Sequence, residues 1–393
     1  MGETLAFKTA KNAMKEFIAR IGYRTKLKVV VFESDDWGAI RIPSVIELEK
    51  YKSRYPEHEL DHYQSYDGLE SFEDIERLCE VLTDYEVESG QPIFTLNYAM
   101  ANPCFEKISI KDPESGFFEY EPITTTYARY FGESNGLDTV RSKPNLFHPQ
   151  LHALEHLNAT RWMRGVTSSE RLRYAFELGL VGVDPDKYCA MDALNKDNDA
   201  IDPSDYLRNA ATLFENVFGY TSESFISPCY VINDDNCKVL NHLGVRTLQG
   251  ARMRNVPSQD GRLSKRINIF GKQNAYGQIQ LIRNCQFEPS KFYHIGASEE
   301  SCVANALADA ELAFKEGQPA VFCTHRVNYT SLIDANNRDY SLRCLNALLS
   351  GLTRNHPDIV FTTSDCLGEI IREEIDGTRK LRHLRNHSSK RES

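Results

Sequence analysis

The sequence has no long hydrophobic run. Across its 393 residues, no segment approaches the roughly 18 consecutive apolar residues that a membrane-spanning helix needs, so we expect no transmembrane segment. The N-terminal residues also lack a central apolar stretch, and their charges are distributed throughout. This pattern argues against a secretion signal and predicts an amphipathic helix over residues 1–26.

The ten cysteines show no pairing pattern. They are scattered as single residues, without the CxxC pair or short-range spacing that would indicate a disulfide scaffold. Scattered thiols of this kind are typical of a reducing compartment. The sequence therefore predicts a cytoplasmic protein with reduced cysteines.

Basic residues are fewer than acidic residues. The chain has 46 Lys and Arg against 56 Asp and Glu, which gives a formal net charge of −10. This balance argues against general nucleic-acid binding. The exception is a basic tail within residues 376–393, where large apolar side chains are few. That composition predicts a solvated, disordered end.

Internal repeats and low-complexity linkers are absent, and short β-branched or aromatic runs instead alternate with helix-like segments. The expected strands are 28–34, 92–98, 145–149, 179–184, 224–228, 245–249, 280–284, 320–325 and 358–363. Between them, helices are expected at 168–179, 236–244 and 301–317. Alternation of this kind predicts an α/β fold with a parallel sheet that closes like a barrel. The barrel domain would span 27–375, with insertions at about 44–90 and 99–144.

Two adjacent carboxylates end the first apolar run. Asp35 and Asp36 follow VVVFES directly, where they repel each other and favour neither helix nor strand. The pair marks either a turn or a site for a cation. Because functional groups of parallel barrels collect at the C-terminal ends of strands, we expect His148 and His325, which also follow apolar runs, to lie near the pair.

The segment HPQLH carries two histidines, His148 and His152, at i and i+4. On one helical turn this spacing places both rings on the same face, close enough to bind one ion. A carboxylate from the Asp35–Asp36 pair would complete a common catalytic zinc set with an open position for water. His156 extends the row by another turn and is expected to lie too far along for the same ion. Such spacing also arises by chance on surface helices.

A second histidine pair matches a known motif. HELDH, residues 58–62, fits the HExxH pattern of zinc peptidases, in which both histidines lie on a helix that packs against the core. Here the motif contains Asp61 and its flanks are polar and turn-like. A solvated loop or helix edge explains it better than a protease site.

Four segments together resemble the polysaccharide deacetylase (NodB-homology) family, in family order over most of the chain. They are FESDDWG (32–38), HPQLH (148–152), ISPCY (226–230) and AVFCTH (320–325). The resemblance implies a distorted (β/α) barrel of about seven strands and a metal-dependent hydrolase that removes N-acetyl or related acyl groups from an amino sugar or glycan. The implied cofactor is one divalent ion, most simply Zn²⁺, and the implied partner is a carbohydrate. The oligomeric state is left open.

The resemblance also implies a role for each matching residue. Asp36, His148 and His152 match the metal triad, Asp35 the general base, and His325 the general acid that protonates the departing amine. The backbone N–H at Tyr230 matches a donor to the oxyanion. Hydrolysis of an acetamide needs an activated water, stabilisation of the oxyanion and a proton for the departing nitrogen, because an acetamide is a poor electrophile with a poor leaving group.

The third motif departs from the family pattern. Ser227 stands where the family has an arginine that orients the catalytic aspartate. Its loss implies either weaker activation or a substitute such as Arg326 or Arg283, and these two arginines are also candidates for the substrate site. Trp37, inserted before the glycine of the first motif, is a further candidate for the substrate site.

Other functions remain open on the sequence alone. They are a non-catalytic glycan-binding scaffold on the same barrel, a glycosidase and, last, the zinc peptidase. The adjacency of Asp35 and Asp36 counts against a glycosidase, because its two carboxylates must flank the scissile bond.

Overall fold

The computed structural model describes residues 21–88, 90–110, 118–132, 135–183, 191–199 and 201–378. Most of the expected N-terminal helix (1–20) and of the basic tail (379–393) lies outside these residues. In the part described, parallel strands form a nine-stranded sheet in the order β10-β7-β6-β5-β2-β1-β12-β11, with β13 paired to β1 beside this path. The strands of this sheet are β1 (Val29–Trp37), β2 (Phe94–Ala99), β5 (Phe147–Ala153), β6 (Ser224–Ile226), β7 (Thr247–Gly250), β10 (Ile279–Ile282), β11 (Cys285–Gln286), β12 (Ala320–His325) and β13 (Val360–Phe361).

The two ends of the sheet belong to one stretch of chain. β10 pairs with β7, and after only two more residues β11 pairs with β12 in the same parallel sense. Between them, the Arg283 N–H donates to the Gly250 carbonyl at 2.9 Å and the Asn284 N–H donates to the Val321 carbonyl at 3.2 Å. Segment 279–286 therefore closes the sheet into a distorted barrel. Its seven members are β1, β2, β5, β6, β7, this segment and β12, which confirms the predicted fold class.

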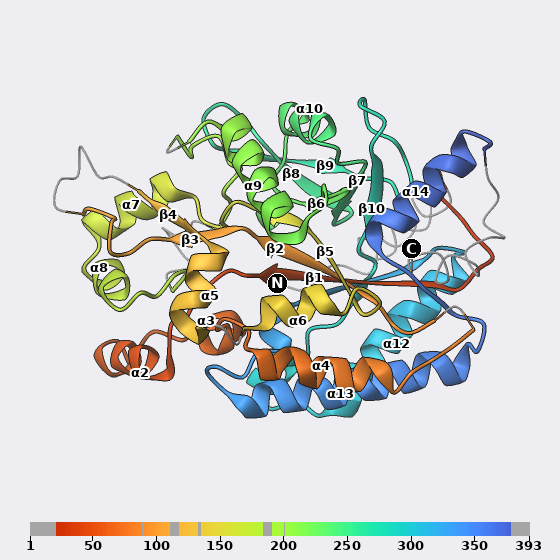
Figure 1. Ribbon diagram of the computed structural model, residues 1–393, viewed down its shortest axis with the longest axis horizontal. Helices are drawn as coiled ribbons and strands as arrows, with labels where there is room; N and C mark the ends of the chain where they lie inside the picture. Colours follow the sequence, from red (N-terminus) through yellow and green to blue (C-terminus); the bar gives the residue numbers. More distant parts are fainter. Residues whose placement is uncertain are drawn as a thin grey trace, which may run out of the picture.

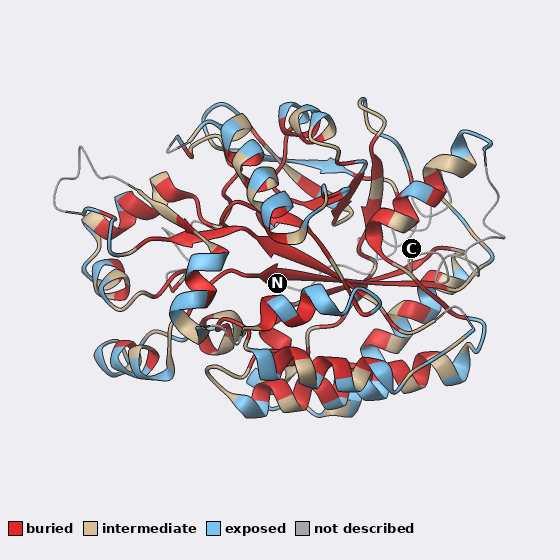
Figure 2. Cartoon of the chain, in the orientation of Figure 1, coloured by how far each residue is buried: buried red, intermediate tan, exposed pale blue. Residues whose placement is uncertain are grey.

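β1 lies at the centre of the barrel wall. All nine of its residues are buried, as expected for a parallel strand covered on both faces. It pairs with β12 on one side, with Asp35 opposite His325, and with β2 on the other. The buried strands run through the middle of the molecule between partly exposed helices (Figure 2).

Helices cover both sides of the sheet. They are α2 (Val45–Arg54), α3 (His62–Tyr66), α4 (Phe72–Thr83), α5 (Ile123–Phe131), α6 (Gly136–Ser142), α7 (Ala159–Ser168), α8 (Glu170–Glu177), α9 (Pro203–Phe218), α10 (Asp234–His242), α11 (Pro289–His294), α12 (Glu299–Lys315), α13 (Ala335–Asn355) and α14 (Ser364–Ile375). Figure 1 shows α4, α12 and α13 below the strands and α9 and α10 above them. The helices of the insertions, among them α2, α3 and α5, lie at the left, toward which β1 points.

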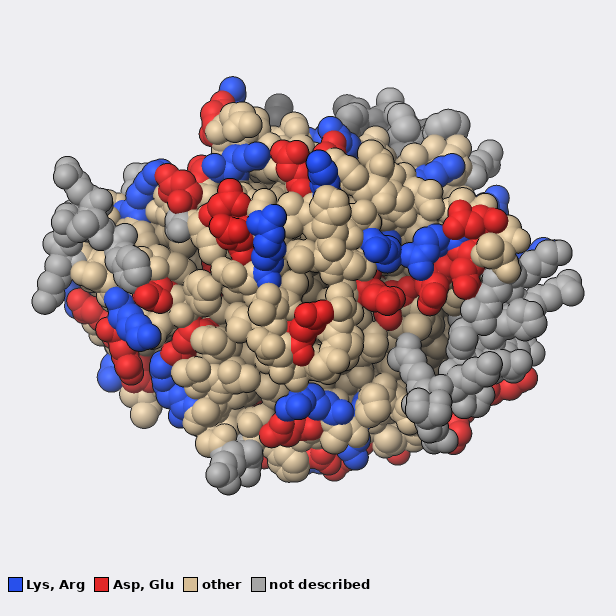
Figure 3. All heavy atoms as spheres, turned by 45° about the horizontal axis from the view of Figure 1, so that its top comes forward, with Lys and Arg blue, Asp and Glu red and all other residues tan. Residues whose placement is uncertain are grey.

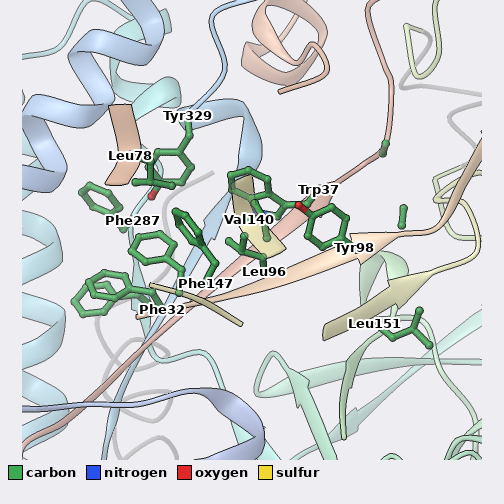
Figure 4. Packing of buried hydrophobic residues seen from close by; sticks show 14 of the residues in the cluster. Phe32, Trp37, Leu78, Leu96, Tyr98, Val140, Phe147, Leu151, Phe287 and Tyr329 are labelled. Carbon is green, nitrogen blue, oxygen red and sulfur yellow. The ribbon is translucent and has the colours of Figure 1, made fainter. Parts of the chain in front are cut away.

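Aromatic side chains fill the main core between β1 and the α4–α13 layer (Figure 4). The Phe32 ring stacks on Phe94 at 4.8 Å and on Phe322 at 5.0 Å between ring centroids. Trp37 lies in the same cluster, fully buried, with Tyr98 at 6.3 Å and Tyr329 at 6.4 Å. Its indole N–H donates to Ser34 Oγ at 2.9 Å. The prediction that Trp37 belongs to the substrate site is therefore wrong, because its ring is part of the core.

Most predicted elements are present. The expected helices correspond to α8, α10 and α12, and eight of the nine expected strands have a counterpart. The exception is 179–184, whose described residues, 179–183, form no strand. Its apolar residues Leu180 and Val183 instead pack in a small core with Leu48 and Tyr51 of α2. Two short antiparallel pairs, β3 (Ala101–Pro103) with β4 (Tyr120–Pro122) and β8 (Met253–Pro257) with β9 (Leu263–Ile267), were not predicted.

The surface carries both signs of charge. On the face shown in Figure 3, clusters of basic side chains lie next to clusters of acidic ones. Among the helices of the described residues, none combines the length and the hydropathy needed to cross a bilayer.

Candidate functional site

The end of β1 brings two neighbouring carboxylates into one site. The register between β1 and β2 shifts between Ser34 and Trp37, and Asp36 has a left-handed backbone (φ 70°). In a regular strand, successive side chains point to opposite faces, and an irregularity of this kind re-aims one of them. Gly38 follows with φ 79°, where an added Cβ would lie 2.7 Å from the Ala99 carbonyl oxygen. The local backbone thus explains how Asp35 and Asp36 can serve the same site.

Asp36 lies against two histidines. Its Oδ1 is 3.3 Å from His152 Nε2 and 3.4 Å from His156 Nε2, and the two imidazole rings are 5.0 Å apart. Among the described residues, these three side chains form the group that could hold a metal ion, with ligand atoms within 4.8 Å of one another. We call them the Asp36 cluster.

The atoms of the Asp36 cluster fit a divalent ion. His152 Nδ1 donates to the Ile226 carbonyl at 2.9 Å, which leaves the lone pair on Nε2 when the ring is neutral. His152 Nε2 and Asp36 Oδ1 are both buried and have no hydrogen-bond partner among the described residues. Burial lowers the pKa of His156 to about 3, so the His156 ring is neutral and able to ligate.

Arg41 occupies the other oxygen of Asp36. Its Nη2 donates to Asp36 Oδ2 at 2.9 Å, and its Nε lies 2.7 Å from Asp67 Oδ2. Burial would raise the pKa of Asp36, but the charge of Arg41 outweighs it and holds that pKa well below its usual value. Asp36 is therefore a carboxylate with one oxygen bound to arginine and one oxygen left for an ion.

The structure corrects the predicted position of His148. Segment 147–153 is strand β5 rather than a helix, and four residues along a strand span about 13 Å, which is too far for one ion. His148 instead bonds to Asp365 Oδ2 at 2.9 Å and stacks on Tyr220. His156, which was expected to lie too far along, takes its place beside Asp36 because the chain turns after β5.

Arg283 holds Asp35 from the opposite wall of the site. Its Nη1 and Nη2 donate to the two carboxylate oxygens, each at 2.6 Å, and its Nε donates to Glu33 Oε2 at 2.6 Å. Asn97 adds a hydrogen bond to Asp35 Oδ1 at 2.8 Å. Burial would raise the pKa of Asp35, but the charge and hydrogen bonds of Arg283 keep it below its usual value. Arg283 thus makes the contact expected of the arginine missing at Ser227.

His325 points one nitrogen toward Asp35 and the other toward Glu288. Its Nε2 is 3.9 Å from Asp35 Oδ2, and its Nδ1 lies 2.5 Å from Glu288 Oε2. Burial would lower the pKa of His325, but the charge of Glu288 and its hydrogen bond raise it to about 10. His325 is therefore an imidazolium at neutral pH. Glu288 was not predicted, because nothing in the local sequence links it to a histidine 37 residues away.

Arg326 does not reach the site. Its guanidinium is fully buried and donates to Asp67 Oδ1 at 2.6 Å, with Glu70 Oε2 at 3.2 Å. The prediction that Arg326 contacts substrate or replaces the missing arginine is wrong, because its donors are already used by these two carboxylates.

The Ser227–Tyr230 loop is strained and its key donor is engaged. Cys229 and Tyr230 both have positive φ, 51° and 57°. The Tyr230 N–H, expected to hold an oxyanion, donates to the Ser227 carbonyl at 3.0 Å. Ser227 and Tyr230 side chains line a cavity with Gln249. The Tyr230 hydroxyl is 3.7 Å from Cys323 Sγ, which in turn lies 3.4 Å from Arg283 Nη1. The N–H expected to hold the oxyanion is not free in this structure.

The HELDH motif is not a metal site. His58 lies before α3 and bonds to the Tyr51 hydroxyl at 2.9 Å, while α3 begins only at His62, capped by Asp61. The two histidines therefore do not share a helix, as the peptidase motif requires. The next residue, Tyr63, nevertheless reaches the site, because its ring packs edge-on against His325 at 5.3 Å.

Comparison with known proteins gives structural matches only. No protein-family model matches the sequence, and no curated protein matches it. The fold is similar to a candidate polysaccharide deacetylase from Mycobacterium smegmatis (11% identity, 90% of this chain and 94% of that chain, TM-score 0.42). It is also similar to one from Pseudomonas aeruginosa (8% identity, 91% and 93%, TM-score 0.46).

A third similar structure is a CE4 family pseudoenzyme from Bacillus anthracis (10% identity, 86% of this chain and 66% of that chain, TM-score 0.37). These likenesses concern the fold alone. A likeness at this level assigns no activity, so the proposal below depends on the residues of the site.

Proposed function

We propose that the protein is a metal-dependent hydrolase that removes an acetyl or related acyl group from the nitrogen of an amino sugar or glycan. The observation that carries the proposal is the division of labour between two adjacent carboxylates. Asp36 leaves one unpartnered oxygen beside His152 and His156, while Asp35 is held by Arg283 and faces His325. Hydrolysis of an amide needs these elements together.

The Asp36 cluster would hold the ion, for which we expect Zn²⁺ on the basis of its nitrogen and oxygen ligands. When bound, such an ion supplies a Lewis acid that polarises an acyl carbonyl and acidifies water. The contribution of the protein is to present neutral imidazoles and a single carboxylate oxygen. The hydrogen bond from His152 to Ile226 and the ion pair of Arg41 with Asp36 fix these groups in place.

Asp35 would act as the general base. Its pKa, depressed against the effect of burial by Arg283, keeps it ionised and able to accept a proton from the attacking water. The two bonds to Arg283 and the one to Asn97 orient the carboxylate. Because Asp35 adjoins Asp36 in the chain, the base lies beside the cluster.

His325 would act as the general acid. The Glu288 carboxylate keeps it protonated, and its Nε2 faces the side of Asp35. An amine leaving group must be protonated before it can depart, so this proton would pass from Nε2 to the amide nitrogen. The same imidazole could then recover a proton through Asp35, which returns both groups to their starting state.

The resemblance of the four motifs supplies the substrate class, an N-acylated amino sugar or glycan. The cytoplasmic location remains part of the proposal. It is supported by the scattered, single-residue spacing of the ten cysteines in the sequence.

The test is metal content and acetate release on the same preparation. We expect about one zinc-like ion per chain, release of acetate from N-acetylglucosamine oligomers, and loss of that release on chelation with recovery on adding Zn²⁺. A protein that holds the ion but releases no acyl group from such oligomers would instead be the glycan-binding scaffold. A protein that retains no ion after addition of zinc contradicts the proposal at its first step.

A further inference from the structure

Hydrolysis of an acyl group needs a hydrogen-bond donor for the oxygen on which negative charge develops. Removing one such donor from an enzyme typically costs about 100- to 1000-fold in kcat. The donor expected from the sequence, the Tyr230 N–H, is turned to the Ser227 carbonyl at 3.0 Å. The following N–H, of Val231, donates to the Pro228 carbonyl at 3.0 Å. Both amides are used inside the turn, so the site needs another donor.

Tyr63 borders the gap between the two halves of the site. On one side its ring lies under the Arg41 guanidinium at 5.1 Å, and Arg41 in turn bonds to Asp36. On the other side the ring meets His325 edge-on at 5.3 Å. The reacting acyl carbon must lie between the Asp36 cluster and the general acid. Tyr63 is therefore placed alongside the reacting group.

The Tyr63 hydroxyl is available. It makes no hydrogen bond to any residue that the structure describes, and Tyr63 as a whole is only partly buried. Burial, followed by the carboxylates of Glu288 and Asp36, raises the pKa of this hydroxyl well above its usual value. A hydroxyl held protonated in this way can donate a hydrogen bond at neutral pH.

The position of Tyr63 is also well defined. Helix α3 is fixed by a capping box between Asp61 and Gln64, and the Gln64 side chain donates to the Gly182 carbonyl at 2.7 Å. Further along the helix, Tyr66 packs on Tyr293 at 5.5 Å. A donor on a helix held at both ends needs little reorganisation at the moment of reaction.

We propose that the Tyr63 hydroxyl is a catalytic residue that donates a hydrogen bond to the acyl oxygen of the substrate, in place of the engaged Tyr230 N–H. The proposal rests on the proposed acyl-hydrolase function. It assigns a catalytic role to the residue that directly follows the HELDH segment, where a protease motif had drawn attention to the histidines. It also predicts that the hydroxyl matters more as charge develops on the oxygen than when the substrate first binds.

The test is Tyr63→Phe, which keeps the ring against Arg41 and His325 and removes only the oxygen. We expect kcat for acetate release to fall about 100-fold with little change in KM, because the bond strengthens in the transition state. Metal content and melting temperature should stay at the wild-type values. The matched control is Tyr66→Phe on the same helix, whose ring packs on Tyr293 and not on His325. We expect it to leave kcat unchanged.

A second readout does not depend on turnover. Methylphosphonate has the tetrahedral shape and oxygen charge of a hydrated acetyl group, and its affinity is measured by calorimetry. We expect Tyr63→Phe to weaken its binding about 10-fold or more, at roughly 1.4 kcal/mol per tenfold change in affinity, and Tyr66→Phe to leave the binding unchanged.

The outcomes separate the two proposals. If the wild type releases acetate and Tyr63→Phe does so equally fast, the role of Tyr63 is overturned and the hydrolase stands. If Tyr63→Phe and Tyr66→Phe lose the same activity, the effect belongs to the helix and the role of the hydroxyl is again overturned. If the wild type neither releases acetate nor binds methylphosphonate, the hydrolase itself is overturned, and the role of Tyr63 with it.

Discussion

Arg283 and Asp35 lie 248 residues apart in the chain and meet through two hydrogen bonds of 2.6 Å, one to each carboxylate oxygen. The guanidinium is buried and also holds Glu33, so three acceptor oxygens fix its plane. This pairing orients the proposed base without any help from the Ser227 loop.

Arg283→Lys should therefore impair catalysis while keeping the charge. A lysine cannot make two parallel bonds to one carboxylate, and a small misplacement of a catalytic group can cost about 100-fold in rate. We expect kcat for acetate release to fall by about that factor, with metal content unchanged. The matched control is Arg266→Lys, a change at an exposed arginine of β9 that bonds to Asp234 of α10. Equal kcat in the two variants would show that the orientation of Asp35 by Arg283 is not needed.

Variants of two histidines in the same segment distinguish the ligand set seen in the structure from the set expected from the sequence. His156→Gln should abolish retention of the ion, because His156 is one of three side chains in the Asp36 cluster. His148→Gln should retain it, because His148 bonds to Asp365 instead. Elemental analysis of both variants after dialysis is the measurement. Loss of the ion in His148→Gln alone would restore the ligand set expected from the sequence.

Glu288→Gln should lower the pKa of His325. In the wild type, burial acts against the imidazolium, and Glu288 overcomes it to raise the pKa to about 10. With a neutral amide in its place, burial dominates, and the imidazole resonances should titrate at a lower pH. Nitrogen-15 NMR of the histidine side chains measures this. An unchanged titration would show that another group charges His325.

The pair of His325 and Glu288 also contributes to the free energy of unfolding over a defined pH range. The pKa of His325 is raised in the folded state from 6.5 to about 10, so the contribution is fully present below pH 6.5 and is lost as the pH rises through about 10. Wild type and Glu288→Gln should therefore differ most in free energy of unfolding at pH 6 and converge toward pH 10. Urea titrations at the two pH values test this, and a difference that grows with pH would contradict it.

Arg326→Gln should destabilise the fold rather than alter the substrate preference. Removing one partner of a buried ion pair costs about 3–5 kcal/mol, because the remaining charges are left unpaired. Here Glu70 would lose its cation, and Asp67 would keep only Arg41. We expect a lower urea midpoint, with a wild-type KM for the fraction that stays folded. A stable variant with a raised KM would return Arg326 to the substrate site.

The sequence was a reliable guide wherever chain-local chemistry decides the structure. The apolar run of β1 and the charged pair that ends it predicted a buried strand with a site at its tip. The structure of segment 147–153 was harder to predict, because residues at i and i+4 share a face on a helix and also on a strand. The long rise per residue of a strand is what places His148 away from Asp36. The local sequence contains no pattern that predicts the bend after β5, which brings His156 beside Asp36.

Long-range contacts set the remaining limit. The choice between Arg283 and Arg326 depends on which strand lies opposite Asp35, and that is a property of the closed barrel. Glu288 and Tyr63 were missed for the same reason, since each reaches His325 from a different part of the chain. The position of Trp37 in the sequence was also misleading. Trp37 directly follows the two carboxylates, but its ring turns into the core.

The segment that closes the barrel has a consequence for how this site can vary. Arg283 belongs to the short connection between β10 and β11, so its direction is set by strand register rather than by the Ser227 loop. A single residue inserted between β10 and Arg283 would reverse the face to which the side chain points. The loop after β6 is meanwhile relieved of orienting the base. In this chain, substitutions in that loop are compatible with an oriented Asp35, whereas a change in the length of segment 279–286 is not.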